Sequence, residues 1–253
     1  MRQGQALIVI LLVLAVALTL GLAVVSRTVT EVGTATTQAE SSRALSKAES
    51  GVEAALSGTI IAGVTATDYS GRQISISEPL AAGESSTIFL AEHDSNGNLD
   101  LIGGLNAYSG NSVDLCWGTE AGSPVAIEAS LYYKELSNYK VVRFAYDPEG
   151  RGGFTRSDTD RTNCPTDHIY LNHATLSSLP AGKILLRVRL LYNGDVAHYV
   201  GVSGSTPFPI QGKNIVSTAT EGNTTRKIEV FQRYPDLSPL LDSAVFSGGG
   251  LAK

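Results

Sequence analysis

Two absences mark the first quarter of this 253-residue chain: it has no proline, and part of it has no charge. No proline occurs before residue 58, so nothing there forces a helix to end. Residues 6–25 contain no charged side chain and read ALIVILLVLAVALTLGLAVV. An α-helix of this length spans roughly 30 Å, about the hydrocarbon thickness of a bilayer. The run therefore predicts a membrane-spanning helix.

A cleaved secretory signal peptide is the alternative interpretation of this run. The apolar part of such a peptide has about 7–15 residues and precedes a cleavage site of small residues. Gly21-Leu22-Ala23 could serve as that site, but the run is longer, and Arg2 is the only basic side chain before it. We expect a membrane anchor, with the N-terminus inside and the polar remainder of the chain outside.

The helical pattern continues beyond the apolar run. Small and apolar residues recur every three or four positions, the period of one helix face. They are Val29, Val32, Ala35, Ala39, Ser42, Leu45, Ala48, Val52 and Leu56. Gly58 then suits the position just after a helix. A single helix over 5–57, roughly 80 Å long, would have an amphipathic second half. Its narrow stripe permits close packing on another helix, or on the protein's own β-rich part.

The chain has no basic patch. Its net charge is −5, and the four basic and four acidic side chains before residue 58 cancel, so the deficit lies in 58–253. An acidic domain argues against nucleic acid as a partner and against docking on an anionic inner leaflet.

Cysteine is scarce, with Cys116 and Cys164 the only two. An even number in a domain expected outside the cytoplasm favours a disulfide. The bond would stabilise the fold by about 4 kcal/mol in the chain-entropy model. Two buried free thiols are the alternative, which a cytosolic location would favour.

Beyond the helix, short segments rich in β-branched and aromatic residues alternate with turn sequences. The strands we expect are 72–77, 86–91, 98–102, 112–117, 124–134, 140–146, 168–171, 183–192, 196–202, 210–220 and 225–232. Asn193-Gly194 is the strongest hairpin signal among the turns, which also include 94–97, 135–138 and 222–223.

This pattern predicts an α+β fold, in which a long N-terminal helix carries a mostly antiparallel, sandwich-like β head. The expected division is a leader over 1–4, a membrane and assembly helix over 5–57, a β-rich head over 58–234 and a flexible tail over 235–253. The tail is rich in proline and glycine, which favours loop structure.

Sequence motifs for catalysis are absent: there is no H-E-x-x-H, G-x-S-x-G, P-loop or G-x-G-x-x-G after a strand. None of His93, His168, His173 and His198 forms an H-E-x-x-H, and His168 and His173 have no acidic or cysteine partner at metal-ligand spacing. Oxygen ligands do alternate as in a calcium loop at Asp94, Asn96, Asn98 and Asp100. The glycine there is misplaced, however, and a hairpin turn explains the segment better. We expect no enzyme activity, no cofactor and no metal.

The leader, the apolar helix and its amphipathic extension together resemble the N-terminal region of type IV pilins and pseudopilins. The resemblance covers about the first quarter of the chain. In that family a prepilin peptidase cuts after a glycine on the cytoplasmic side of the apolar run, and Gly4 followed by Gln5 matches that site. The resemblance implies processing there and methylation of the new N-terminus. Residues 48–53, AESGVE, are also similar to a stretch common in minor pilins.

Two positions depart from the family pattern. Val9 stands where major pilins carry a glutamate that is thought to pair with the N-terminal amine of a neighbouring subunit. Such a charge is costly in a bilayer without its partner. Its absence implies a minor subunit that caps, primes or decorates a filament. Gln5 replaces a first mature residue that is usually apolar or aromatic.

The resemblance implies a minor pilin-like or pseudopilin-like structural subunit of a type IV pilus or a type II secretion-type filament. It would be anchored in the inner membrane before assembly and lie at the cell surface or in the filament afterwards. Its partners would be the inner membrane, other pilin-like subunits and the prepilin peptidase. A permanently membrane-anchored surface adhesin or glycan-binding β domain is the alternative.

Overall fold

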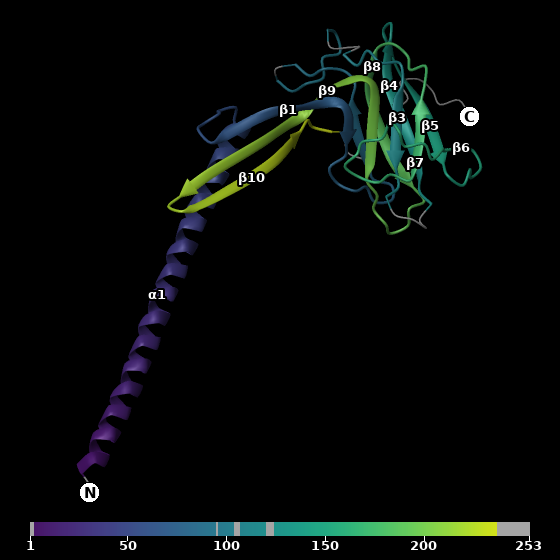
Figure 1. Cartoon of the computed structure of the whole chain (residues 1–253). Helices are drawn as coiled ribbons and strands as arrows, with labels where there is room; N and C mark the ends of the chain where they lie inside the picture. Colours follow the sequence, from purple (N-terminus) through teal and green to yellow (C-terminus); the bar gives the residue numbers. More distant parts are fainter. Residues whose placement is uncertain (1–2, 95, 104–106, 120–123, 237–253) are drawn as a thin grey trace. The chain divides into compact units, whose positions relative to one another are not determined.

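A computed structural model describes residues 3–94, 96–103, 107–119 and 124–236 of the chain. A single long helix, α1 (Gln3–Leu56), precedes the strands (Figure 1). The strands are β1 (Val64–Ser75), β2 (Ser85–Phe89), β3 (Val113–Trp117), β4 (Ala126–Glu135), β5 (Asn138–Asp147), β6 (Thr155–Arg156), β7 (Asn172–Leu176), β8 (Lys183–Leu191), β9 (Val200–Glu221) and β10 (Thr224–Arg233).

The helix α1 runs without a break through both the apolar and the amphipathic segments, as the sequence predicted. Hydroxyls on its exposed surface donate to carbonyls one turn back, for example Thr30 to Ser26 at 2.9 Å. The helix ends at Leu56, and Gly58 follows it with a φ of +87°. This conformation turns the chain back, so that the Thr59 N–H donates to the Ala54 carbonyl at 2.8 Å. A left-handed glycine is the usual device for closing a helix C-terminus.

The chain forms two compact units. The first, the helix unit, contains residues 3–67 and 214–231, and the second, the sandwich unit, contains the described residues of 68–213 and 232–236. Residues 214–231 cluster with the helix, although the sequence analysis placed them in the head. The strands β1, β9 and β10 each continue from one unit into the other.

Two five-stranded sheets confirm the predicted α+β fold with a sheet sandwich (Figure 1). One sheet has the order β1-β9-β3-β7, with β10 also paired to β9, and the other has the order β2-β8-β4-β5-β6. The strand pairs β3–β9, β3–β7, β4–β8 and β4–β5 are antiparallel, whereas β5 and β6 are parallel.

The core of the sandwich unit follows from the two-residue period of its strands. Leu115 of β3 lies opposite Val202 of β9, and Leu131 of β4 lies opposite Leu186 of β8. These four side chains are buried in one cluster around Trp117, whose indole N–H donates to the Val125 carbonyl at 2.8 Å. The alternate residues of β3 and β7 lie on the outer face of their sheet.

Most of the expected strands are present, and two of the predicted hairpins are confirmed. The strands β4 and β5 pair around the turn at 135–138, and β9 pairs with β10 around Gly222 and Asn223. The predictions of strands over 98–102 and 168–171 were wrong. In the second of these, Leu171 donates its N–H to the Gly118 carbonyl at 2.7 Å, just before β7 begins.

The hairpin predicted at Asn193-Gly194 is also wrong. The flanking strands belong to different sheets, because β8 pairs with β2 and β4 whereas β9 pairs with β1, β3 and β10. Asn193 is buried, and its Nδ2 donates to the Val196 carbonyl at 2.7 Å and to the Leu80 carbonyl at 3.4 Å. The turn therefore connects the two layers. The predicted tail of 235–253 lies outside the described residues from position 237 onward.

Candidate functional site

The first feature that could carry function is the uncovered part of α1. Every residue from 10 to 39 is exposed, including large side chains such as Leu14, Leu20 and Val29. Within the part of the chain that the structure describes, α1 alone is long and apolar enough to span a membrane. The predicted processing residues Gly4 and Gln5 belong to the same helix.

The buried stripe of α1 is shorter than the sequence predicted. Ala44 and Ala48 have no exposed surface and Val52 is 8% exposed, so the packed face occupies only the last third of the helix. Val32 and Leu45, which the prediction assigned to this face, are exposed. The difference arises because the stripe is covered only where the chain supplies a partner, the β9–β10 hairpin of the helix unit (Figure 1).

Small side chains allow the helix to approach this hairpin closely. Val52 of the helix, Val64 of β1 and Ile215 of β9 form the buried cluster of this unit. A Cβ added to Gly51 would lie 2.3 Å from the Ser217 Oγ and 2.8 Å from the Val64 Cγ2, both inside van der Waals contact. A side chain at the glycine of the AESGVE segment would therefore force Ser217 and Val64 to shift within the helix unit.

Polar contacts hold the tip of the hairpin against the helix turns that precede Gly51. The Glu40 carboxylate accepts the Asn223 N–H at 3.3 Å, and the guanidinium of Arg226 donates to the Ser41 hydroxyl at 2.6 Å. Lys47 forms an ion pair with Glu221 and thereby lowers the pKa of that carboxyl. The helix and the hairpin are thus joined by polar groups at the rim of a small apolar contact.

On the sandwich unit, the predicted disulfide is confirmed. Cys116 of β3 is bonded to Cys164, which lies in the long connection between β6 and β7, with an S–S distance of 2.00 Å. Both cysteines are buried beside Tyr170, and burial is the main cause that raises the pKa of this tyrosine to about 12. The bond holds that connection on the outer face of the sheet.

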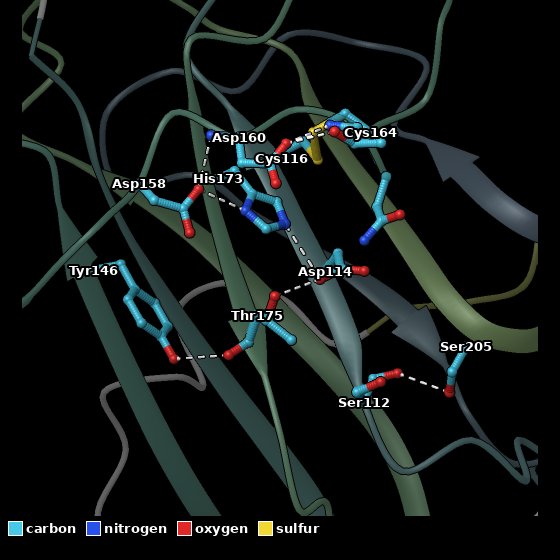
Figure 2. Close-up of polar contacts among 12 residues, drawn as sticks. Ser112, Asp114, Cys116, Tyr146, Asp158, Asp160, Cys164, His173, Thr175 and Ser205 are labelled. Atoms are coloured by element: carbon cyan, nitrogen blue, oxygen red, sulfur yellow. Dashed lines mark hydrogen bonds and ion pairs between the residues drawn. A yellow bond between two sulfur atoms is a disulfide. The ribbon is translucent and has the colours of Figure 1, made fainter.

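A polar cluster that sequence reasoning missed lies next to the disulfide (Figure 2). The imidazole of His173 contacts two carboxylates, with Nδ1 2.7 Å from Asp158 Oδ1 and Nε2 3.2 Å from Asp114 Oδ1. Thr175 donates its hydroxyl to the same Asp114 oxygen at 2.6 Å. Asp158 belongs to the connection that the disulfide holds, so the cluster is a second attachment of that segment.

The cluster has the residue types of a catalytic triad without its geometry. Thr175, the only hydroxyl in it, donates to the Asp114 carboxylate, and both ring nitrogens of His173 face carboxylates. A nucleophile must instead contact the histidine that takes its proton. Strand alternation could have indicated that Asp114 and Cys116 share a face, but pairing with β7 is needed to add His173.

The segment considered for calcium uses its carboxylates in its own turns. Asp94 Oδ1 accepts the N–H groups of Asn96 and Asn98 at 2.8 and 2.9 Å, and the Asn98 contact is the main cause that lowers the pKa of Asp94. Asp100 Oδ1 accepts from Gly103 at 2.8 Å. Among the described residues, no group of three or more acidic, histidine or cysteine side chains is placed to hold a metal.

The remaining histidines pack against aromatic rings or bond to the backbone. His93 stacks on Tyr234 at 3.6 Å between ring centroids, and His168 stacks on Tyr199 at 3.8 Å. The Nδ1 of His198 accepts the Thr119 N–H at 3.2 Å. These contacts account for the three side chains as parts of the fold.

Comparison with known proteins adds no relative: no family model, no curated protein and no solved structure matches the chain. The function must therefore be argued from the helix, the disulfide and the polar surface described above.

Proposed function

We propose that this protein is a minor pilin-like or pseudopilin-like structural subunit of a type IV pilus or type II secretion-type filament. The observation that carries the proposal is the single helix α1, whose first part is exposed and apolar and whose last part holds a β-hairpin. Such a helix can lie in a membrane before assembly and pack among identical or related helices afterwards.

The exposed part of the helix extends beyond the length that a bilayer can cover. Residues 6–25 match the hydrocarbon layer, yet Val29 and Val32 beyond them are 67% and 61% exposed. Apolar side chains on an uncovered helix face favour association with another surface. The neighbouring helices of a filament would cover these positions and the threonines around them.

The disulfide supports an extracytoplasmic position for the β sandwich. Structural disulfides persist in oxidising compartments and are uncommon in the cytosol of most organisms. With the short leader inside, the chain would cross the membrane once and present the sandwich outside. After assembly, the sandwich would lie on the outer surface of the filament.

In this proposal the protein acts by packing and display, without a bond-making step. The His173 cluster supports this interpretation because its hydroxyl and its imidazole are not arranged for proton transfer. The partners would be the inner membrane, other pilin-like subunits and the prepilin peptidase, with no nucleic acid.

The experiment is the intact mass and N-terminal sequence of the protein from its native membrane. We expect a chain that begins at Gln5 and carries one added methyl group. A Gly4→Leu variant should retain Met1, because the peptidase requires the glycine. A wild-type chain that keeps Met1, or one cut after Ala23, would contradict the proposal. The first of these outcomes would instead favour a permanently anchored surface adhesin.

A further inference from the structure

A polar groove of about 650 Å³ lies on the outer face of the sheet β1-β9-β3-β7, within the sandwich unit. Its walls include Arg72 and Gln73 of β1, Asp114 of β3 and Ser203 of β9, together with Thr162 and Asn163. Asp114 and Ser203 are direct neighbours in the β3–β9 register. Figure 2 shows Asp114 beside Ser112 and Ser205 at this edge of the His173 cluster.

Ser203 forms part of the floor of the groove and is unusual. Its side chain is buried, with 5% of the residue exposed, and its Oγ has no hydrogen-bonding partner. Buried hydroxyls are almost always paired, and an exception calls for an explanation. A hydroxyl group of a ligand in the groove would supply the missing partner once a side chain that covers the Ser203 Oγ turns aside.

The groups around Ser203 are held only weakly by each other. Gln73 Nε2 lies 3.3 Å from the Cys164 carbonyl, Arg72 Nε lies 3.4 Å from the Gly204 carbonyl, and Ser205 Oγ lies 3.4 Å from the Ser112 carbonyl. These distances are longer than the usual range for N–H···O and O–H···O hydrogen bonds, so the contacts are weak. These donors can turn toward a ligand at little cost, while the disulfide keeps the Asn163 wall in place.

The chemistry of the walls selects a neutral ligand with many hydroxyls. One guanidinium is offset by one carboxylate, and the other polar side chains are amides and hydroxyls, which both donate and accept. A cation would find a single carboxylate, whose Oδ1 is already bonded to Thr175. An anion would be attracted by the guanidinium of Arg72 but repelled by the carboxylate of Asp114.

We propose that this groove binds a neutral sugar ring through its hydroxyl groups. Its described walls include no aromatic side chain, so recognition would rest on hydrogen bonds. We therefore expect a dissociation constant on the order of 1 mM. The inference goes beyond the proposed filament role and does not depend on it, because all the residues belong to the sandwich unit.

The test uses the full chain in lipid nanodiscs, free of sugar-based detergents. The probes are the methyl glycosides of glucose, galactose, mannose and N-acetylglucosamine, each titrated to about 10 mM. Saturation-transfer NMR should detect binding of at least one of them, and the amide resonances of residues 203–205 should shift. No transfer from any of these glycosides would overturn the proposal.

The discriminating variant is Ser203→Ala. It removes a hydroxyl that has no partner in the free chain, so the thermal unfolding temperature should not fall, whereas binding should weaken by about fivefold. Ser157→Ala is the matched control, since that hydroxyl is also buried and without a partner but does not line the groove. Unchanged binding by Ser203→Ala, or an equal loss in both variants, would contradict the proposal.

Discussion

The described core cluster of the sandwich unit has 22 buried apolar residues, whereas that of the helix unit has three, Val52, Val64 and Ile215. The sandwich unit also has the disulfide. The helix unit relies on close contact at Gly51 and on polar groups such as Glu40 and Lys47. Because hydrophobic burial is the main favourable term in folding, most of the hydrophobic stabilisation lies in the sandwich. The helix unit would gain most from a membrane or from neighbouring helices.

The strongest test of this comparison is removal of the disulfide. Cys116→Ser combined with Cys164→Ser should lower the unfolding free energy of the sandwich by about 4 kcal/mol, because the bond closes a long loop in the unfolded chain. Trp117, the only tryptophan and fully buried, reports urea unfolding by its fluorescence. Hydrogen exchange of residues 214–231 should not change. An equal loss of protection there would show that the two units unfold as one.

A smaller effect is expected from Gly51→Ala in the helix unit. The new methyl group would collide with Ser217 and Val64, at a cost of about 1–3 kcal/mol. Amide exchange of residues 215–220 should accelerate. Gly33→Ala is the control within the same helix, since nothing lies within 4 Å of its added Cβ. The Gly33→Ala variant should stabilise α1 by about 0.5–1 kcal/mol through helix propensity. Slower amide exchange of residues 215–220 in Gly51→Ala would contradict the packing argument.

The smallest effect concerns the ion pair between Lys47 and Glu221. Lys47 holds the pKa of Glu221 below its ordinary value. The pair therefore stabilises the fold at pH values above the ordinary carboxyl pKa, and this stability is lost as the pH falls through the lowered pKa of the folded state. Lys47→Met should return the carboxyl pKa of Glu221 toward its ordinary value in an NMR titration. Lys47→Arg should keep it low. A titration of Glu221 that is identical in Lys47→Met and the wild type would exclude the pair in solution.

Features set by nearby residues were predicted well from the sequence. The absence of proline and the period of three to four residues gave the correct extent of α1, and two cysteines allow only one intrachain pairing. The turn at 222–223 is also local, and its hairpin is present. The Asn193-Gly194 signal failed because the flanking strands found partners far away in the sequence, in two different sheets.

The amino-acid sequence by itself determined the long helix, its uncharged segment over 6–25, the β-rich remainder and the cysteine pair, because helical period, hydropathy and residue counts act over short distances along the chain. Only the tertiary structure decided which part of the helix stripe is covered, why Gly51 must be small, and how Asp114, Asp158 and His173 meet. These outcomes depend on β3 pairing with both β7 and β9, and on β9 extending to the helix unit. Such contacts join residues widely separated in the chain, and no local pattern encodes them.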